Sequence, residues 1–230
     1  MGIGVTNIFQ GDLRDYSVVE KALANISEIY LITPNFAADE DLMFENILKV
    51  AKNRPHFRII LHSVIHPQIS ELPHHYSRLK LEQRLINSGV EWVILQPTMY
   101  MQNVLTQLKS IYHNHVLQLP IPVDRMMTLV DLNDVVQVAA DAVSSKTYNY
   151  GIFELCGETL SLRQQALCLS KLIGSNIKAE EISVETAKRS LKIPYKGKYG
   201  NNTYEAMFRY YSEYGLSGSK KVLQLLLNRE

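Results

Sequence analysis

Polar side chains follow four apolar runs of the sequence and could together bind a small molecule. They are Asp12, Thr33-Pro34-Asn35, His62-Ser63, and Pro97-Thr98 with Tyr100. Ligands of open α/β sheets bind outside the carboxyl ends of the strands, so these segments are expected to meet at one crevice. The Asp12 carboxylate could accept a hydrogen bond from an adenine amino group, or it could begin a turn. The Ser63 hydroxyl could donate to a substrate carbonyl, or it could satisfy the backbone of its own loop.

A second group of chemically active side chains lies in the segment His74–Lys80. Tyr76 and Lys80 are four residues apart, which places them on one face of a helix. A neighbouring cation favours the phenolate and lowers the pKa of the phenol, so this pair could act as a general acid. His74 and Arg78 have the same spacing on a neighbouring face. The sequence alone does not decide which of the two pairs faces the site.

The composition disfavours several other classes of protein. Lys and Arg exceed Asp and Glu by one, so no net attraction to nucleic acid or to an anionic membrane is expected. The tyrosines near the C-terminus therefore indicate helix packing rather than a nucleic-acid surface. The two cysteines form no C-x-x-C pair, the histidines lack the spacing of metal ligands, and no G-x-S-x-G elbow exposes a serine. No apolar run has the length of a membrane helix, and the expected location is the cytoplasm.

The elements that would position these side chains alternate along the first hundred residues. Four short apolar runs predict strands at Val5–Gln10, Ile29–Ile32, Arg58–His62 and Glu91–Leu95. Amphipathic stretches between them predict helices at Tyr16–Ala24, from Asp39 or Glu40 to Lys52, and at Glu71–Ser88, with Asp15 as the first N-cap. Because the runs are apolar throughout rather than alternating, the sheet is expected to be parallel, covered on both faces and doubly wound.

The pattern changes after Pro97. Further helices are predicted at Tyr100–Tyr112, Asp131–Val143, Ser161–Ile173, Val184–Leu191 and Tyr204–Tyr214, and short strands at Val116–Leu119, Ile152–Cys156 and Ile177–Ser183. Ser161 is the expected N-cap of its helix, and Gly174 is expected to end that helix. The polar, turn-rich segment Lys192–Asn202 predicts a mobile loop.

Several segments, taken in order, resemble the NmrA-like family of atypical short-chain dehydrogenases. They are Gly11–Asp15, His62–Pro67, Leu72–His75 followed by Glu82, Ser88–Pro97 with Tyr100–Asn103, Val130–Val135, and Phe153–Gly157 with Leu160-Ser161. The match covers about residues 5–190. The resemblance implies an α/β, Rossmann-like domain that binds NADP or NAD, with a small α+β subdomain for the substrate. It implies either NAD(P)H-dependent reduction of a quinone or other small carbonyl compound, or a non-catalytic regulator that responds to the nucleotide or to a protein partner.

On this resemblance the candidate residues fall into two groups. The expected catalytic residues are Ser63, His74, Tyr76, Arg78 and Lys80. The expected cofactor-binding residues are Asp12, Leu13, Thr33, Pro34, Asn35, His62, Pro97, Tyr100 and Asn103. Ser63 would orient a carbonyl, His74 or Tyr76 would supply the proton, and Lys80 or Arg78 would supply positive charge. Residues 1–115 would form part of the nucleotide-binding domain, to which 131–156 return, and residues 116–130 and 157–230 would form the small subdomain.

Two departures from the family pattern bear on function. The sequence has only 11 glycines and no G-x-x-G-x-x-G turn, so a first strand–helix–strand unit of roughly 50 residues is expected to be missing. Without that turn the pyrophosphate loses its cradle of backbone N–H groups, so weak dinucleotide binding is expected. Exposed sheet edges would permit self-association.

The second departure concerns the Tyr-x-x-x-Lys pair of short-chain dehydrogenases. Counted back from Ser88-Gly89, that pair falls on His74 and Arg78. Arginine is not a conservative replacement for lysine. This departure favours the regulator, and a remnant translated from an internal start codon is a third hypothesis.

Overall fold

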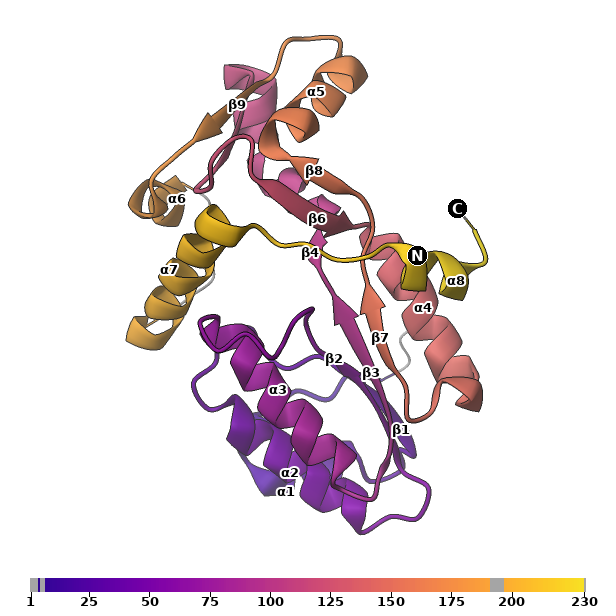
Figure 1. Cartoon of the computed structure of the whole chain (residues 1–230). Coiled ribbons are helices and arrows are strands. Elements are labelled where there is room, and N and C mark those ends of the chain that lie inside the picture. The colour runs from indigo at the N-terminus through magenta and orange to yellow at the C-terminus, as the bar shows by residue number, and fades with distance from the viewer. Residues whose placement is uncertain (1–3, 5–6, 191–196, 230) are drawn as a thin grey trace.

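The main element of the structure is a four-stranded parallel sheet. The computed structural model describes residues 4, 7–190 and 197–229. The strands lie in the order β1 (Glu28–Leu31), β2 (Arg58–His62), β3 (Glu91–Pro97) and β7 (Ile152–Leu155), and every pairing is parallel. One face is covered by helices α1 (Tyr16–Ala22), α2 (Glu40–Lys52) and α3 (Pro73–Ile86), and the other by α4 (Leu132–Ser144) and α8 (Lys221–Leu227) (Figure 1). The prediction of a parallel, doubly wound α/β sheet is confirmed.

Burial on both faces explains why the central strand is apolar at successive positions. All five residues of β2 are buried. Ile59 and Leu61 belong to the core beneath α1, α2 and α3, whereas Ile60 belongs to the opposite core and packs with Val93 and Leu95 against α4. Successive side chains of a strand alternate between its two faces, so a strand that is covered on both sides needs apolar residues on each face.

The predicted helix caps are confirmed. The Asp15 side chain accepts a hydrogen bond from the backbone N–H of Ser17 at the start of α1. Ser161 and Gln164 form a reciprocal capping box at the start of α5 (Leu162–Ile173), and Gly174 ends that helix in the left-handed conformation that glycine tolerates best.

The C-terminal half adds two small sheets beyond the carboxyl ends of the main sheet (Figure 1). The first contains β4 (Met99–Tyr100), β6 (Met126–Val130) and β8 (Thr159–Ser161), and the second contains β5 (Val116–Leu119) and β9 (Lys178–Glu181). Helices α5, α6 (Val184–Ser190) and α7 (Gly197–Tyr214) surround them. Met101–Gln107 forms a 3-10 helix, Ser110–Asn114 a π-helix and Lys146–Tyr148 a second 3-10 turn.

Several segments differ from what the sequence predicts. Residues 7–10 form no strand and Ile8 is 90% exposed, while Val5 and Thr6 lie outside the described residues. An extended segment needs a neighbour for its backbone groups, and among the described residues β1 is hydrogen-bonded to β2 alone. The predicted helix at 100–112 is a short strand followed by 3-10 and π-helical turns.

The sequence pattern also predicted the C-terminal helices only in part. Helix α7 begins at Gly197, inside the segment that was expected to be mobile, and residues 192–196 of that segment lie outside the described residues. Tyr204, Phe208 and Tyr211 of α7 are buried in one cluster, so tertiary packing stabilises this polar-looking stretch as a helix. Helix α8 and strands β6 and β8 were not predicted.

Candidate functional site

A cavity of about 430 Å³ lies between the carboxyl ends of the main sheet and the C-terminal elements. Aromatic and thioether side chains form much of its wall, including Phe36, Met99, Met101, Met207 and Phe208. Polar side chains also line it, among them Asn35, His62, Ser63, His74, Arg78, Tyr100 and Asn103. The structure therefore brings the ends of β2 and β3, together with the loop after β1, to one cavity.

Three side chains form a hydrogen-bonded chain beside this cavity. The hydroxyl of Tyr30, in the edge strand β1, contacts Nδ1 of His62, and Nε2 of His62 lies 2.5 Å from the hydroxyl of Tyr100. Burial, with a smaller contribution from the Arg78 cation, lowers the pKa of His62 to about 4. Burial raises the pKa of both tyrosines. All three side chains are therefore neutral at pH 7.

Arg78 is held in a buried ion pair at the edge of the cavity. Its Nη1 lies 2.8 Å from Oε1 of Glu40, and both side chains are 3% exposed. The same guanidinium donates to the side-chain hydroxyl and the carbonyl oxygen of Thr33, and Thr33 donates in turn to Glu40. Ser77 donates to the other Glu40 oxygen over 2.7 Å. The cation is therefore neutralised and fixed in place.

The Ser63 hydroxyl is engaged by a buried carboxyl group. It donates to Oε1 of Glu82, and the side-chain amide of Gln96 donates to both Glu82 oxygens over 2.9 and 3.1 Å. Burial raises the pKa of Glu82, while the hydrogen bonds from Ser63 and Gln96 oppose the rise. Ser63 lines the cavity, but its proton is directed away from a ligand carbonyl in this arrangement.

Two adjacent histidines of α3 also line the cavity. His74 packs edge-on against Phe36, with ring centres 4.7 Å apart, and burial lowers its pKa to about 3. Nδ1 of His75 lies 2.7 Å from the carbonyl oxygen of Ile65, and its Nε2 lies 3.2 Å from the hydroxyl of Tyr211. A carbonyl can only accept, so the His75 proton lies on Nδ1 and its Nε2 accepts from Tyr211. Burial lowers the pKa of His75 to about 4.

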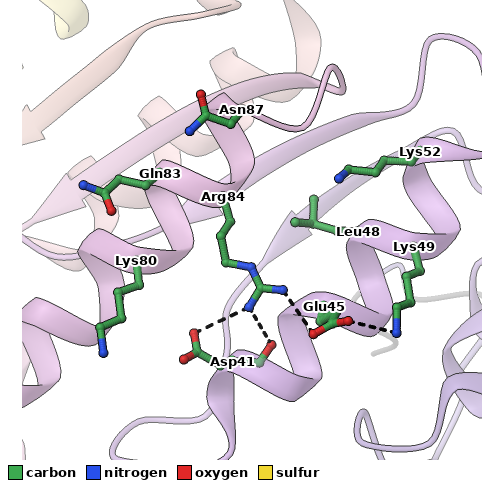
Figure 2. Close-up of a pocket in the computed structure, with 9 residues that line it drawn as sticks. All are labelled: Asp41, Glu45, Leu48, Lys49, Lys52, Lys80, Gln83, Arg84 and Asn87. Atoms are coloured by element: carbon green, nitrogen blue, oxygen red, sulfur yellow. Dashed lines mark hydrogen bonds and ion pairs between the residues drawn. The ribbon is translucent and has the colours of Figure 1, made fainter.

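Tyr76 and Lys80 lie outside the cavity. Tyr76 is 41% exposed, and the Lys80 ammonium lies 5.3 Å from the centre of its ring. Lys80 lines a separate hollow of about 680 Å³ between α2 and α3, where Arg84 pairs with Glu45 over 3.3 Å (Figure 2). The sequence left open whether Tyr76 and Lys80 or His74 and Arg78 face the site. In the structure, His74 and Arg78 line the cavity.

Some of the residues predicted to bind the cofactor line the cavity, and others do not. Pro97, Tyr100, Asn35, Asn103 and His62 line the cavity, and Thr33 is buried next to it. Asp12 does not line it: its exposed carboxylate pairs with Arg14 over 2.6 Å, which lowers the Asp12 pKa to about 2. Leu13 packs against the core beneath α2, and Pro34 is exposed.

The fit to a dinucleotide is uneven. Side-chain amides of Asn35 and Asn103 could bond to one end of such a molecule at the cavity. In the described part of the chain, however, no glycine-rich turn connects a strand to a helix. The carboxylate of Asp15 already occupies the N-terminus of α1, where it would repel a phosphate. The described residues therefore do not fit the pyrophosphate.

Sequence reasoning missed several groups that shape the site. They are Tyr30, Glu40, His75 and Tyr211, together with the acidic role of Glu82. One signal was present: Arg78 and Glu82 are charged residues on the same helix face as Leu81 and Leu85, which are buried. Charged residues on an apolar helix face need buried partners. Within the described residues, no cluster of three potential metal ligands occurs, and none of the helices combines the length with the hydropathy of a membrane span.

Comparisons with known proteins agree with this architecture. A family model described as the NmrA-like family matches residues 3–225. A (4-alkanoyl-5-oxo-2,5-dihydrofuran-3-yl)methyl phosphate reductase of Streptomyces griseus is 25% identical, over 84% of this chain and 68% of its own length. The chain spans about two thirds of the length of the curated relatives it matches.

Solved structures show the same fold. A complex of an NADPH-dependent quinone oxidoreductase from Escherichia coli with NADPH superimposes with a TM-score of 0.81 and 21% identity, covering 97% of this chain and 79% of that one. A negative transcriptional regulator in complex with NAD superimposes with a TM-score of 0.76 and 15% identity, covering 96% and 76%.

Proposed function

The chain belongs to the NmrA-like family, and we propose that its cavity is the substrate site of an NAD(P)H-dependent oxidoreductase that acts on a quinone or another small carbonyl compound. The observation that carries this proposal is the make-up of the cavity. Phe36, Met99 and Phe208 offer flat or adaptable apolar surface to a ring, while Tyr100 and His74 offer neutral hydrogen-bond donors to its oxygen atoms. Relatives named as reductases and as a quinone oxidoreductase support the reaction class.

The proposed roles of the polar residues follow from their contacts. Tyr100 and His74 donate to the substrate oxygen, because burial keeps both side chains uncharged at neutral pH. Arg78, which lines the cavity, contributes a positive potential that its pairing with Glu40 weakens. Ser63 accepts rather than donates, since its proton is directed to Glu82.

We further propose that the 230-residue chain binds its cofactor, NADP or NAD, weakly. In related folds, backbone N–H groups at a helix N-terminus bind the negatively charged pyrophosphate. The described residues of this chain do not provide such a site. This polypeptide is therefore expected to bind its substrate while binding the dinucleotide only weakly. The dinucleotide is expected to have a Kd above roughly 10 µM, which corresponds to about −7 kcal/mol.

Calorimetric titration separates these two expectations. A hindered naphthoquinone should bind one-to-one, and NADPH and NADH should bind above the stated Kd. Tight dinucleotide binding would contradict the weak-cofactor proposal alone. Failure of naphthoquinone and of simpler aromatic ketones to bind would contradict the substrate proposal.

A second candidate function is a non-catalytic module that responds to NAD(P) or to a regulatory protein partner. The observation that favours it is the Arg78–Glu40 pair, in which a cation that lines the cavity is already neutralised. Steady oxidation of NADPH in the presence of quinone, lost in a Tyr100→Phe variant, would exclude this alternative. Quinone binding without any turnover at saturating NADPH would favour it.

A further inference from the structure

His62 differs from the other buried histidine, His75, because each of its ring nitrogens faces a hydroxyl group. The hydroxyl of Tyr30 contacts Nδ1, and the hydroxyl of Tyr100 lies 2.5 Å from Nε2. A hydroxyl can donate or accept, whereas a neutral imidazole has one donor nitrogen and one acceptor nitrogen. The chain Tyr30–His62–Tyr100 can therefore be satisfied in either of two opposite directions.

The first direction suits a ligand oxygen that accepts. Tyr30 donates to Nδ1, Nε2–H donates to the oxygen of Tyr100, and the Tyr100 proton is free to point into the cavity. In the second direction Nδ1–H donates to the oxygen of Tyr30, Nε2 accepts from Tyr100, and the Tyr100 oxygen can accept from a ligand hydroxyl. The number of protons on the three side chains is the same in both arrangements.

His75, the other buried histidine, does not have this freedom. The carbonyl of Ile65 lies 2.7 Å from Nδ1 of His75 and can only accept, so the His75 proton is fixed on Nδ1. Both histidines are buried and both border the same cavity. Their hydrogen-bond partners, and not their burial, distinguish them.

We propose that the Tyr30–His62–Tyr100 chain lets the cavity bind both oxidation states of its ligand, donating to a carbonyl oxygen in one tautomer of His62 and accepting from a hydroxyl in the other. Tyr100 is the contact residue, and His62 and Tyr30 are positioning residues that act through it. This inference rests on the proposed carbonyl-type substrate. It adds that the reduced product is held as well as the substrate, because exchange of the tautomer avoids an unpaired buried polar group in either state.

The experiment follows the His62 tautomer by NMR in chain labelled with nitrogen-15 at histidine, at pH 7. The first probe is 2,3-dimethyl-1,4-naphthoquinone, whose substituted ring carbons resist addition of the exposed Cys168 thiol. The second probe is the corresponding hydroquinone, added without oxygen. The two nitrogen resonances of His62 are expected to exchange their protonated and unprotonated character between the probes, while those of His75 keep theirs.

Two variants assign the effect to Tyr100. Tyr100→Phe should bind each probe about fivefold more weakly, the loss of one hydrogen bond, and should abolish the exchange at His62. Tyr112 is 57% exposed and does not line the cavity, so Tyr112→Phe should keep the exchange. Unchanged His75 resonances report that each variant is folded.

Three outcomes would overturn the inference. Binding of both probes with one and the same His62 tautomer refutes it while leaving the proposed function intact. An exchange that persists in Tyr100→Phe shows that ligands reach His62 without Tyr100. Failure of both probes to bind refutes the proposed function, and the inference with it.

Discussion

The guanidinium of Arg78 lies 2.8 Å from the carboxylate of Glu40, and the two side chains, one from α3 and one from α2, are each 3% exposed. They join the helices that cover one face of the sheet, and Arg78 also lines the cavity. Removing one partner of such a pair leaves the other charge buried and unpaired. The pair therefore couples the stability of the fold to the shape of the site.

Glu40→Gln should destabilise the chain by about 3–5 kcal/mol, because the Arg78 charge loses its buried counter-ion. Urea denaturation measures this difference in the free energy of unfolding. The matched control is Glu45→Gln, which breaks exposed contacts with Arg84 and Lys49 and should cost less than about 1 kcal/mol. Equal costs for the two variants would show that the buried pair is not structurally important.

Acidification should destabilise the fold between about pH 6.5 and pH 4. Burial lowers the pKa of His62 and His75 to about 4 and that of His74 to about 3, whereas unfolded histidines titrate near 6.5. In this window the unfolded state binds protons that the folded state does not, so the free energy of unfolding falls as the pH falls. Each such proton contributes about 1.4 kcal/mol per pH unit.

The raised pKa of Glu82 acts in the opposite direction, because the folded state takes up that proton first as the pH falls. Denaturant titrations at pH 7, 6 and 5 test the net effect of these groups. His62→Gln should reduce the slope of the free energy of unfolding against pH by the contribution of about one proton. A free energy of unfolding that is constant from pH 7 to pH 5 would contradict the assignment of neutral, buried histidines.

Truncations of two apolar side chains should have very different effects. Leu61→Ala empties a fully buried position in the central strand and should cost about 2–5 kcal/mol. Ile8→Ala, in the segment that forms no strand, should change the free energy of unfolding by less than about 0.5 kcal/mol because Ile8 is 90% exposed. A cost above 1 kcal/mol at Ile8 would mean that this segment is packed in solution.

Much of the main sheet could be predicted because its signals are local. The apolar run Ile59–Leu61 indicates a strand buried on both faces, and Asp15, Ser161 and Gly174 mark helix ends through contacts within a few residues. Residues 7–10 carry the same apolar signal without forming a strand, because pairing depends on a neighbour and not on the segment itself.

The site was less predictable because its decisive contacts join residues far apart in the sequence. Nothing near Tyr30 indicates that its hydroxyl reaches His62, 32 residues away. The helical register of Tyr76 and His74 was ambiguous for the same reason. The pairs Tyr76/Lys80 and His74/Arg78 have identical spacing. Only the packing of α3 decides which pair lines the cavity.

That packing can be tested with ligand binding. Tyr76→Phe and Lys80→Ala should leave the Kd for 2,3-dimethyl-1,4-naphthoquinone within twofold, because neither residue lines the cavity. His74→Ala should weaken binding by at least about fivefold, through the loss of one donor and of a ring contact. Calorimetry measures all three. The opposite pattern would place the substrate in the hollow between α2 and α3 (Figure 2).

We propose above that a small carbonyl compound binds in the cavity at the carboxyl ends of the main sheet. The most direct test is a titration of nitrogen-15 histidine-labelled chain with 2,3-dimethyl-1,4-naphthoquinone, because His62 and His74 line this cavity and His113 does not. Saturable shifts of the His62 and His74 resonances are expected, with an unchanged His113 resonance. The absence of saturation up to about 1 mM, or shifts at His113 without any at His62 and His74, would contradict it.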